Sequence, residues 1–323
     1  GLPTPRRDLW DKNSYRCIWT QEKMQPWTPL YPAVSMVRAS WGCRMKCTFC
    51  VVPQLSNSTH MASPVERTAD EIASAPSDHI YFCDDENFID EKFAHDLADA
   101  LERRGVKKRY FAWSRAATVN RSPELFVRWR ELGLDTVFIG FEFIDTKELK
   151  AVKKGGSAAS NERALKALRS LDIAVHAAFM VQPHYDEGHF ERLRHYIRAL
   201  PPAQCSFTVC TPSPGSKDYE RIQDQIWVDN ANDLHDCMHA ITPTRLPLKR
   251  FNQLFARQVA EGVAKTPLRQ NRHPLHLGDI VKVVGASLYY QYAFRTLGWN
   301  YRLRRPPEKF QVSSGLTAPV AGD

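Results

Sequence analysis

The chain has 323 residues, of which 43% are hydrophobic and 25% are charged. This length suits one large domain, or one domain with an appendage, and the composition is typical of a soluble globular protein. The absence of any run of about 18 apolar residues argues against a membrane-spanning helix, and the first residues lack the apolar core of a signal peptide. Eight scattered and clustered cysteines without a secretion signal predict a cytoplasmic protein instead of a secreted disulfide scaffold.

The net charge of +8 is distributed unevenly along the chain. Thr244 to Phe310 contains 13 Lys and Arg against 3 Asp and Glu, a balance of +10, which leaves −2 for the rest. An excess of basic residues that is confined to one segment does not by itself indicate a nucleic-acid-binding protein. It favours a local site for an acidic substrate, an anionic membrane surface or a partner.

Residues 1–32 show no clean period and are expected to form a linker or wrapping arm. From residue 33 onward, apolar runs alternate with helical patterns. Strands are expected at 33–39, 80–83, 110–113, 136–139, 173–181 and 205–210. Helices are expected at 63–74, 90–103, 122–133, 146–153, 160–170 and 187–199. A capping box at Ser63–Glu66 and an N-cap at Asp90 open the first two of these helices.

Alternation of this kind predicts βα units around a parallel sheet. Six strands are too few for a closed eight-stranded barrel, so an open, partial (β/α)6 barrel is expected over residues 33–216. Helices at 245–264 and 279–296, with no strand between them, predict a helical extension over residues 217–312. Residues 313–323 are expected to be a flexible tail.

Three cysteines lie close together directly after the first expected strand, at Cys43, Cys47 and Cys50. The carboxyl edge of a parallel sheet is where ligands bind. Three thiolates repel one another unless a cation neutralises them, and they leave one iron of a four-iron cluster open to substrate. Two alternatives are three buried core cysteines, and a structural zinc with a fourth ligand from Cys17, His60 or Cys83.

The C-x3-C-x2-C spacing, with an aromatic residue before the last cysteine, resembles the radical S-adenosylmethionine (SAM) superfamily. The resemblance continues in five further segments: Leu2–Leu9, Ile80–Phe88, Glu142 at the end of the fourth strand, Lys153–Gly155 and Phe207–Ser216. It is closest to the group that contains the anaerobic Mg-protoporphyrin monomethyl ester cyclase and cobalamin-dependent methyltransferases. The implied fold is the partial barrel of the radical SAM type.

The resemblance implies that Cys43, Cys47 and Cys50 bind a [4Fe-4S] cluster whose open iron binds SAM. It places Phe49 against the adenine of SAM, although ordinary loop packing explains this phenylalanine equally well. Where the family often has Gly-x-Pro after the fifth strand, this chain has Val181-Gln182-Pro183, which puts the local SAM geometry in question.

Four charged residues at strand ends are the further candidates for SAM binding. Asp84 and Asp85 are expected to accept a hydrogen bond from the SAM ammonium group, or else to serve in helix capping or a solvated turn. Glu142 is expected to contact a ribose hydroxyl, the alternative being a salt bridge to Arg115. Arg115 is itself expected to hold the SAM carboxylate.

The implied activity is cleavage of SAM to a 5′-deoxyadenosyl radical, used for methyl transfer or cyclisation on a hydrophobic, acidic small molecule, a lipid or a tetrapyrrole. An electron donor such as ferredoxin or flavodoxin is the implied partner. Cobalamin is raised as a further cofactor, but no residues before Leu2 could bind it. Either that domain has been lost or this is a cobalamin-free relative, and both alternatives stay open.

The C-terminal segment Asp279–Arg305 holds a group of apolar and aromatic residues followed by three arginines: Leu288, Tyr289, Tyr290, Tyr292, Phe294, Trp299 and Tyr301, then Arg302, Arg304 and Arg305. It is expected either to cover the open barrel as a helix, or to form a substrate platform at a membrane surface, so that the protein would be cytoplasmic or peripheral to the membrane. Rival functions are a zinc-stabilised binding module, a tRNA-modifying radical SAM enzyme and an inactive scaffold. A nucleic-acid partner is not favoured, because no RNA-binding domain is evident.

Overall fold

The computed structural model describes residues 4–9, 11–12, 14–17, 19, 32–201, 203–270 and 277–301. Most of the predicted arm, the arginines Arg302, Arg304 and Arg305 and the tail 313–323 lie outside these residues. So does the start of the Leu2–Leu9 segment. None of the described helices combines the length and apolarity needed to cross a membrane.

Six parallel strands form the main sheet, and their order in the sheet follows their order in the chain. They are β1 (Val34–Val37), β4 (His79–Phe82), β5 (Arg109–Ser114), β6 (Leu134–Glu142), β7 (Ala174–Val181) and β8 (Gln204–Val209). All six coincide with the expected strands, with shifted ends. The α/β partial barrel with a helical C-terminal extension is therefore confirmed.

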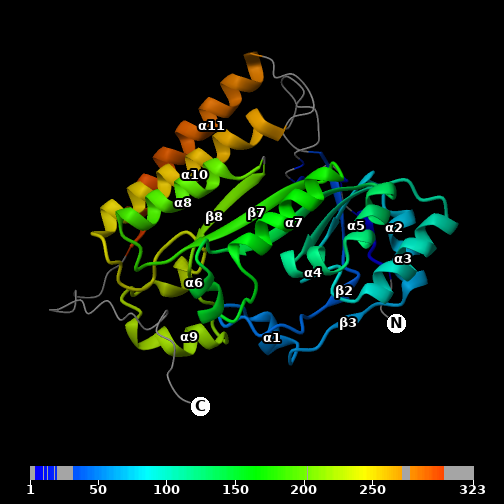
Figure 1. Cartoon of the computed structure of the whole chain (residues 1–323), viewed down its shortest axis with the longest axis horizontal. Helices are drawn as coiled ribbons and strands as arrows, with labels where there is room; N and C mark the ends of the chain where they lie inside the picture. The colour runs from blue at the N-terminus through cyan, green and yellow to red at the C-terminus, as the bar shows by residue number, and fades with distance from the viewer. Residues whose placement is uncertain are drawn as a thin grey trace.

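The helices that join these strands cover one face of the sheet (Figure 1). The longer ones are α2 (Val65–Ser74), α3 (Glu91–Arg103), α5 (Pro123–Glu131), α7 (Ala158–Ser170) and α8 (Glu187–Ala199). Asp90 caps α3 as expected, because its side chain accepts a hydrogen bond from Phe93 N. The sequence did not predict β2 (Ser40–Trp41), β3 (Met61–Ala62), α1 (Val52–Leu55), α4 (Ala116–Arg121) and α9 (Lys217–Ile222).

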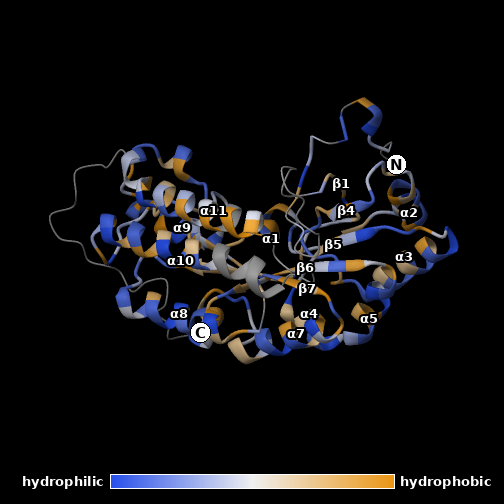
Figure 2. Cartoon of the chain, turned by 90° about the horizontal axis from the view of Figure 1, so that it is seen from above, coloured by the Kyte–Doolittle hydropathy of each residue, from blue (hydrophilic) through white to orange (hydrophobic). Residues whose placement is uncertain are grey.

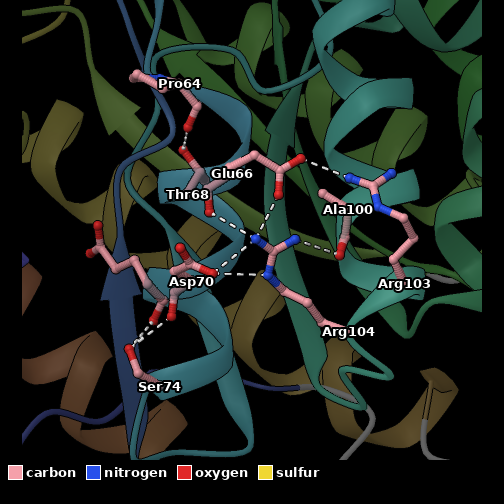
Figure 3. A network of polar contacts seen from close by, with 9 residues as sticks. Pro64, Glu66, Thr68, Asp70, Ser74, Ala100, Arg103 and Arg104 are labelled. Carbon is pink, nitrogen blue, oxygen red and sulfur yellow. Dashed lines mark hydrogen bonds and ion pairs between the residues drawn. The ribbon is translucent and has the colours of Figure 1, made fainter.

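The capping box expected at Ser63–Glu66 is wrong. Helix α2 begins after Pro64 without a side-chain cap. The Glu66 carboxylate instead accepts hydrogen bonds from Arg103 and Arg104 of α3, and Arg104 also binds Asp70 (Figure 3). Glu66, whose side chain the capping box would have used, instead forms ion pairs with Arg103 at the end of α3 and with Arg104 directly after it. These residues therefore join α2 to α3.

Side chains alternate across the sheet because successive residues of a strand point to opposite faces. On the helix-covered side, residues such as Phe82, Val137 and Val175 are fully buried in one large core. On the opposite, concave side, Tyr81, Trp113, Phe138 and His176 are only partly buried. The sheet thus has a dry face under the helices and a half-open aromatic face.

The helical extension packs against the last strand. Helix α10 (Leu248–Gln270) buries Phe251 and Phe255 completely in the same core as the sheet. A Cβ on Gly262 would meet Phe207 at 2.6 Å and the Cys205 carbonyl oxygen at 2.8 Å, so this glycine lets α10 approach β8 closely. Helix α11 (Leu277–Arg295) lies outside α10 (Figure 1). Cys205 and Cys210 are both buried in this region.

Candidate active site

The three clustered cysteines lie on one loop between β2 and α1, beyond the carboxyl end of β1. Cys47 is buried, while Cys43 and Cys50 are half-buried. The thiols are close enough to affect one another electrostatically, since Cys47 raises the pKa of Cys43 and both raise that of Cys50. The backbone bond from Cys50 N to Cys47 O, at 3.2 Å, closes the turn that brings them together.

Burial opposes ionisation of these thiols. It raises the pKa of Cys43, and it raises the pKa of Cys50 to about 11. Two cations counteract burial: Arg115 favours the Cys43 thiolate and Lys154 favours the Cys50 thiolate. Soft thiolate ligands that need further positive charge suit an iron–sulfur cluster, so the residues present fit the implied cofactor.

Arg115 follows β5 and reaches the cysteine loop from the side. Its Nη1 lies 3.5 Å from Cys47 Sγ, and its Nη2 donates to the Lys154 carbonyl oxygen. The guanidinium therefore joins the cysteine loop to the segment after β6. The described partners of Arg115 are a sulfur and a carbonyl group, and its contact with the SAM carboxylate stays a prediction.

Glu142 ends β6 with a positive φ of 62° and pairs with Lys154, whose Nζ is 2.8 Å from its Oε1. The salt bridge to Arg115 that the sequence offered as an alternative is thus replaced by one to Lys154. Gly140 makes room for this pair: a Cβ there would lie 2.0 Å from Glu142 Oε1 and 2.9 Å from Lys154 Nζ. A non-glycine residue held at positive φ beside a candidate site indicates that the surrounding packing imposes its position.

Asp84 and Asp85 both brace the backbone in front of the cysteines. Asp84 is almost fully buried and accepts hydrogen bonds from Ala39 N at 3.1 Å and Ser40 Oγ at 2.5 Å. Burial raises the pKa of Asp84 to about 6. Asp85 accepts from Gly42 N at 2.8 Å and pairs with Arg38 at 3.2 Å. These contacts are neither the helix capping nor the solvated turn that was the alternative for the pair, and the contact with the SAM ammonium group stays a prediction.

Phe49 packs beside the ends of β6 and β7, in an apolar cluster with Phe143, Leu149, Val152 and Met180. Its half-buried ring makes the loop packing that was one of the two expectations. The adenine contact stays a prediction.

Thr48 fastens the same loop to two other segments. Its backbone N–H binds the Val152 carbonyl oxygen at 3.0 Å, and its hydroxyl donates to Asp218 Oδ2 at 3.0 Å. Asp218, on α9, is completely buried and returns a backbone hydrogen bond to the Thr48 carbonyl oxygen at 2.9 Å. The cysteine loop, α6 (Thr146–Ala151) and α9 thus meet at the carboxyl rim of the sheet (Figure 1).

Glu86 is a candidate site residue that the sequence reasoning missed. It is 1% exposed and accepts hydrogen bonds from Ser114 Oγ at 3.1 Å and Thr118 Oγ1 at 3.3 Å. It also interacts electrostatically with both Arg115 and Cys43. The signal available was alternation, because Phe82, Asp84, Glu86 and Phe88 share one parity and all four are buried.

Among the described residues, no group of three or more His, Cys, Asp or Glu side chains is already arranged around a single metal ion, so the zinc alternative is tested by the metal that the purified chain binds. Zinc draws tetrahedral ligands in to about 2.0–2.3 Å, whereas a four-iron cluster spreads its cysteines around a larger body. Val181 stands where Gly was expected, and the buried Gln182 beside it has no hydrogen-bond partner for its Oε1 within the described chain.

Comparison with known proteins decides which family this arrangement represents. A model described as "Radical SAM superfamily" matches residues 39–197, which include the cysteine loop and the strands β4 to β7. The chain belongs to the radical SAM superfamily.

Radical SAM proteins of known activity are among its relatives. The chain is 30% identical over 215 residues to the hopanoid C-3 methylase of Methylococcus capsulatus, a match that covers 67% of this chain and 41% of the methylase. It is 25% identical over 209 residues to the anaerobic magnesium-protoporphyrin IX monomethyl ester cyclase of Cereibacter sphaeroides, covering 62% and 34%. The bacteriochlorophyllide d C-12(1)-methyltransferase of Chlorobaculum tepidum is 23% identical over 211 residues, covering 62% and 45%. The matches span less than half of each relative.

Solved structures share the fold of this radical SAM chain at low identity. The cobalamin-dependent SAM radical enzyme OxsB superposes with a TM-score of 0.53 at 16% identity, over 80% of this chain and 46% of OxsB. The radical SAM methyltransferase TsrM of Kitasatospora setae superposes with a TM-score of 0.55 at 12% identity, over 84% and 64%. These likenesses concern the fold alone. The three relatives described above are two methylating enzymes and a cyclase.

Proposed function

We propose that Cys43, Cys47 and Cys50 hold a [4Fe-4S] cluster that binds SAM, and that the enzyme functionalises a C–H bond of a hydrophobic, ring-containing molecule. The observation that carries the proposal is the position of three mutually interacting thiols, with Arg115 3.5 Å from Cys47 Sγ, at the rim of a half-open aromatic face. The cluster and SAM, when bound together, would supply the chemistry, which is one-electron cleavage of the SAM sulfonium.

The chain's own residues would hold the cysteine loop in position and offset the negative charge of its thiolates. Arg115 and Lys154 offset the negative charge of the thiolates from two sides. Asp85, through Gly42 N, fixes the backbone that enters the loop. Gly42 has a φ of 83°, and a Cβ there would meet the Thr59 carbonyl oxygen at 2.2 Å, so the loop needs glycine at this point.

The concave face supports a substrate with flat or fused rings. Trp113 and Phe138 lie with ring centroids 4.0 Å apart, Phe138 and His176 4.8 Å apart, and Tyr81 and Trp113 6.3 Å apart. Burial lowers the pKa of His176 to about 4, so this imidazole is neutral at physiological pH and adds no charge to the wall. Such an apolar surface suits hopanoids and tetrapyrroles, the molecules named for the relatives.

Within that class we favour methyl transfer, because two of the three relatives described above are methylating enzymes. Cobalamin enters the proposal as the methyl carrier by analogy with the cobalamin-dependent OxsB, and ferredoxin or flavodoxin as the electron donor. Measuring the cobalamin bound to the purified protein would test the cobalamin part of this proposal.

The deciding experiment is anaerobic reconstitution with iron and sulfide, followed by SAM and dithionite. The chain is expected to bind about four irons and to absorb broadly near 400 nm. It should release 5′-deoxyadenosine or, during methyl transfer, S-adenosylhomocysteine. Cys47→Ala is expected to lose most of the iron and at least a hundredfold in product.

Cys83→Ala is the matched control, since Cys83 is a half-buried cysteine on the next strand's end whose thiol donates to the Tyr81 carbonyl oxygen. It should keep both iron and product. A colourless chain with one tightly bound zinc would replace the proposal with a zinc module. An iron-loaded chain that leaves SAM intact would instead indicate an inactive scaffold.

A further inference from the structure

Helix α11 has one packed face and one bare face. On the packed face, Phe294 contacts Phe255 of α10 with ring centroids 5.5 Å apart, and Ser287 Oγ lies 3.5 Å from the Ala260 carbonyl oxygen. Tyr301, just beyond, accepts a hydrogen bond from Ala240 N at 2.7 Å. These contacts hold the helix against α10, and no described residue packs on its other face.

The bare face carries a continuous apolar row, here called the outer stripe. Its members are spaced four, three, four and four residues apart, which places them on one side of a helix. They are Leu277, Val281, Val284, Leu288 and Tyr292, with exposed fractions from 51% to 78%. Figure 2 shows hydrophobic residues along α11. Apolar side chains exposed in a contiguous row mark an interaction surface.

Exposed aromatic residues and the exposed Arg295 lie close in sequence to Tyr292, the last member of the outer stripe. Tyr289 is 66% exposed and Trp299 is 79% exposed, and Arg295 is also exposed. Tyrosine and tryptophan favour the boundary between water and lipid, because their rings are apolar at one end and polar at the other.

We propose that the outer stripe docks the enzyme on the surface of an anionic lipid bilayer, with α11 lying in the interface. Charge selects the occupant: the segment Thr244–Phe310 that contains α11 has a balance of +10. Anionic lipids complement this charge. A second copy of the chain would bring the same positive charge against it. No described helix can span the membrane, so docking is peripheral.

Flotation of the 323-residue chain with vesicles tests the proposal. Vesicles of equal parts phosphatidylcholine and phosphatidylglycerol are expected to bind the chain, and added salt should weaken the binding. The triple variant Val281→Ser, Leu288→Ser, Tyr292→Ser should bind at least tenfold more weakly. Val127→Ser, at a 43%-exposed apolar position on α5, is the matched control and should bind within twofold of the original chain.

Vesicles that fail to bind the unsubstituted chain, or that bind the triple variant equally well, overturn the proposal. A dimer by light scattering that the triple variant converts to a monomer, without vesicle binding, assigns the stripe to a second copy. Should the triple variant melt at a lower temperature, Leu288→Glu alone is compared instead. The inference is independent of the proposed reaction, because it concerns no residue of the candidate site.

Discussion

The surroundings of Glu148 change the pH at which its carboxyl group ionises. It lies on α6, in the wall of a cavity of about 310 Å³ formed with His184, Tyr185 and Arg192. Its Oε2 accepts a hydrogen bond from the Tyr185 hydroxyl at 3.1 Å, while its buried Oε1 has no hydrogen-bond partner in the described chain and lies 4.0 Å from His184 Nε2. Burial raises the pKa of Glu148 to about 7 and lowers that of His184 to about 4. His184 is therefore uncharged near neutral pH, whereas Glu148 is protonated in about half of the molecules at pH 7.

The raised pKa makes the contribution of Glu148 to stability depend on pH. The folded state retains a proton that the unfolded chain loses near pH 4.5, so its contribution is complete below pH 4.5 and is lost as the pH rises through 7. Glu148→Gln mimics the neutral acid. We expect it to raise the free energy of unfolding by roughly 2 kcal/mol at pH 8, and by less than about 0.5 kcal/mol at pH 4.5.

Urea unfolding of both proteins at the two pH values measures this difference. Glu131→Gln, at an exposed position on α5, is the control and should change stability little at either pH. An equal effect of Glu148→Gln at pH 4.5 and pH 8 would contradict a raised pKa for the native side chain.

For single residues, the sequence indicates which side chains could share a site better than it indicates which side chains pair with one another. The spacing of Cys43, Cys47 and Cys50 indicates a shared site, because the three lie within one short loop. The partner of Glu142 is Lys154 and not Arg115, which depends on the path of the backbone after β6. Glu86 was missed because a buried acid looks like an ordinary turn residue until its neighbours are known.

At the scale of elements, the cysteine loop depends on segments far from it in the sequence. Thr48 binds α9, which begins 169 residues later at Lys217, through the buried carboxylate of Asp218. Arg221 also pairs with Asp218. Helix α9 was not predicted, since its six residues are too few for a clear helical period. The longer helices were predicted, with α8 at its exact bounds of 187 and 199, because capping residues and period agree there.

Removing the Thr48 hydroxyl should loosen this tie. Thr48→Val keeps the shape and the backbone hydrogen bonds, but it deprives a fully buried carboxylate of one donor. We expect the free energy of unfolding to fall by about 1–3 kcal/mol, and the reconstituted iron to be lost faster to a chelator. Urea unfolding and the rate of bleaching near 400 nm are the measurements.

Thr59→Val provides the comparison within the same region. The Thr59 hydroxyl donates to the Ser56 carbonyl oxygen at an exposed position, so its loss should cost under about 0.5 kcal/mol. If the two variants were equally stable and bleached at equal rates, the Thr48–Asp218 contact would have no role in holding the loop.

For the whole molecule, the sequence predicts six βα units and a helical extension, but not where the extension packs. The apolar face of α10 could cover any exposed strand edge as far as its periodicity shows. Helix α10 packs beside β8 because the two surfaces fit closely there, and Gly262 allows this approach since it has no side chain. Trp19 in the arm likewise donates to Asp135 Oδ2 at 3.1 Å, a contact across 116 residues that no local pattern indicates.

The shared core predicts that the extension and the barrel unfold together. Phe255 is fully buried, belongs to the same apolar cluster as β4 to β8, and supports α11 through Phe294. Phe255→Ala should therefore lower the stability of the whole chain by about 3–5 kcal/mol, and Phe255→Leu by less. Calorimetry should show one transition that moves to lower temperature. Tyr292→Ala, on the outer stripe, should leave that transition nearly in place, because its ring is 63% exposed. A second, smaller transition that alone responds to Phe255→Ala would show instead that α10 and α11 form a separate unit, since a core divided in two can melt in two steps.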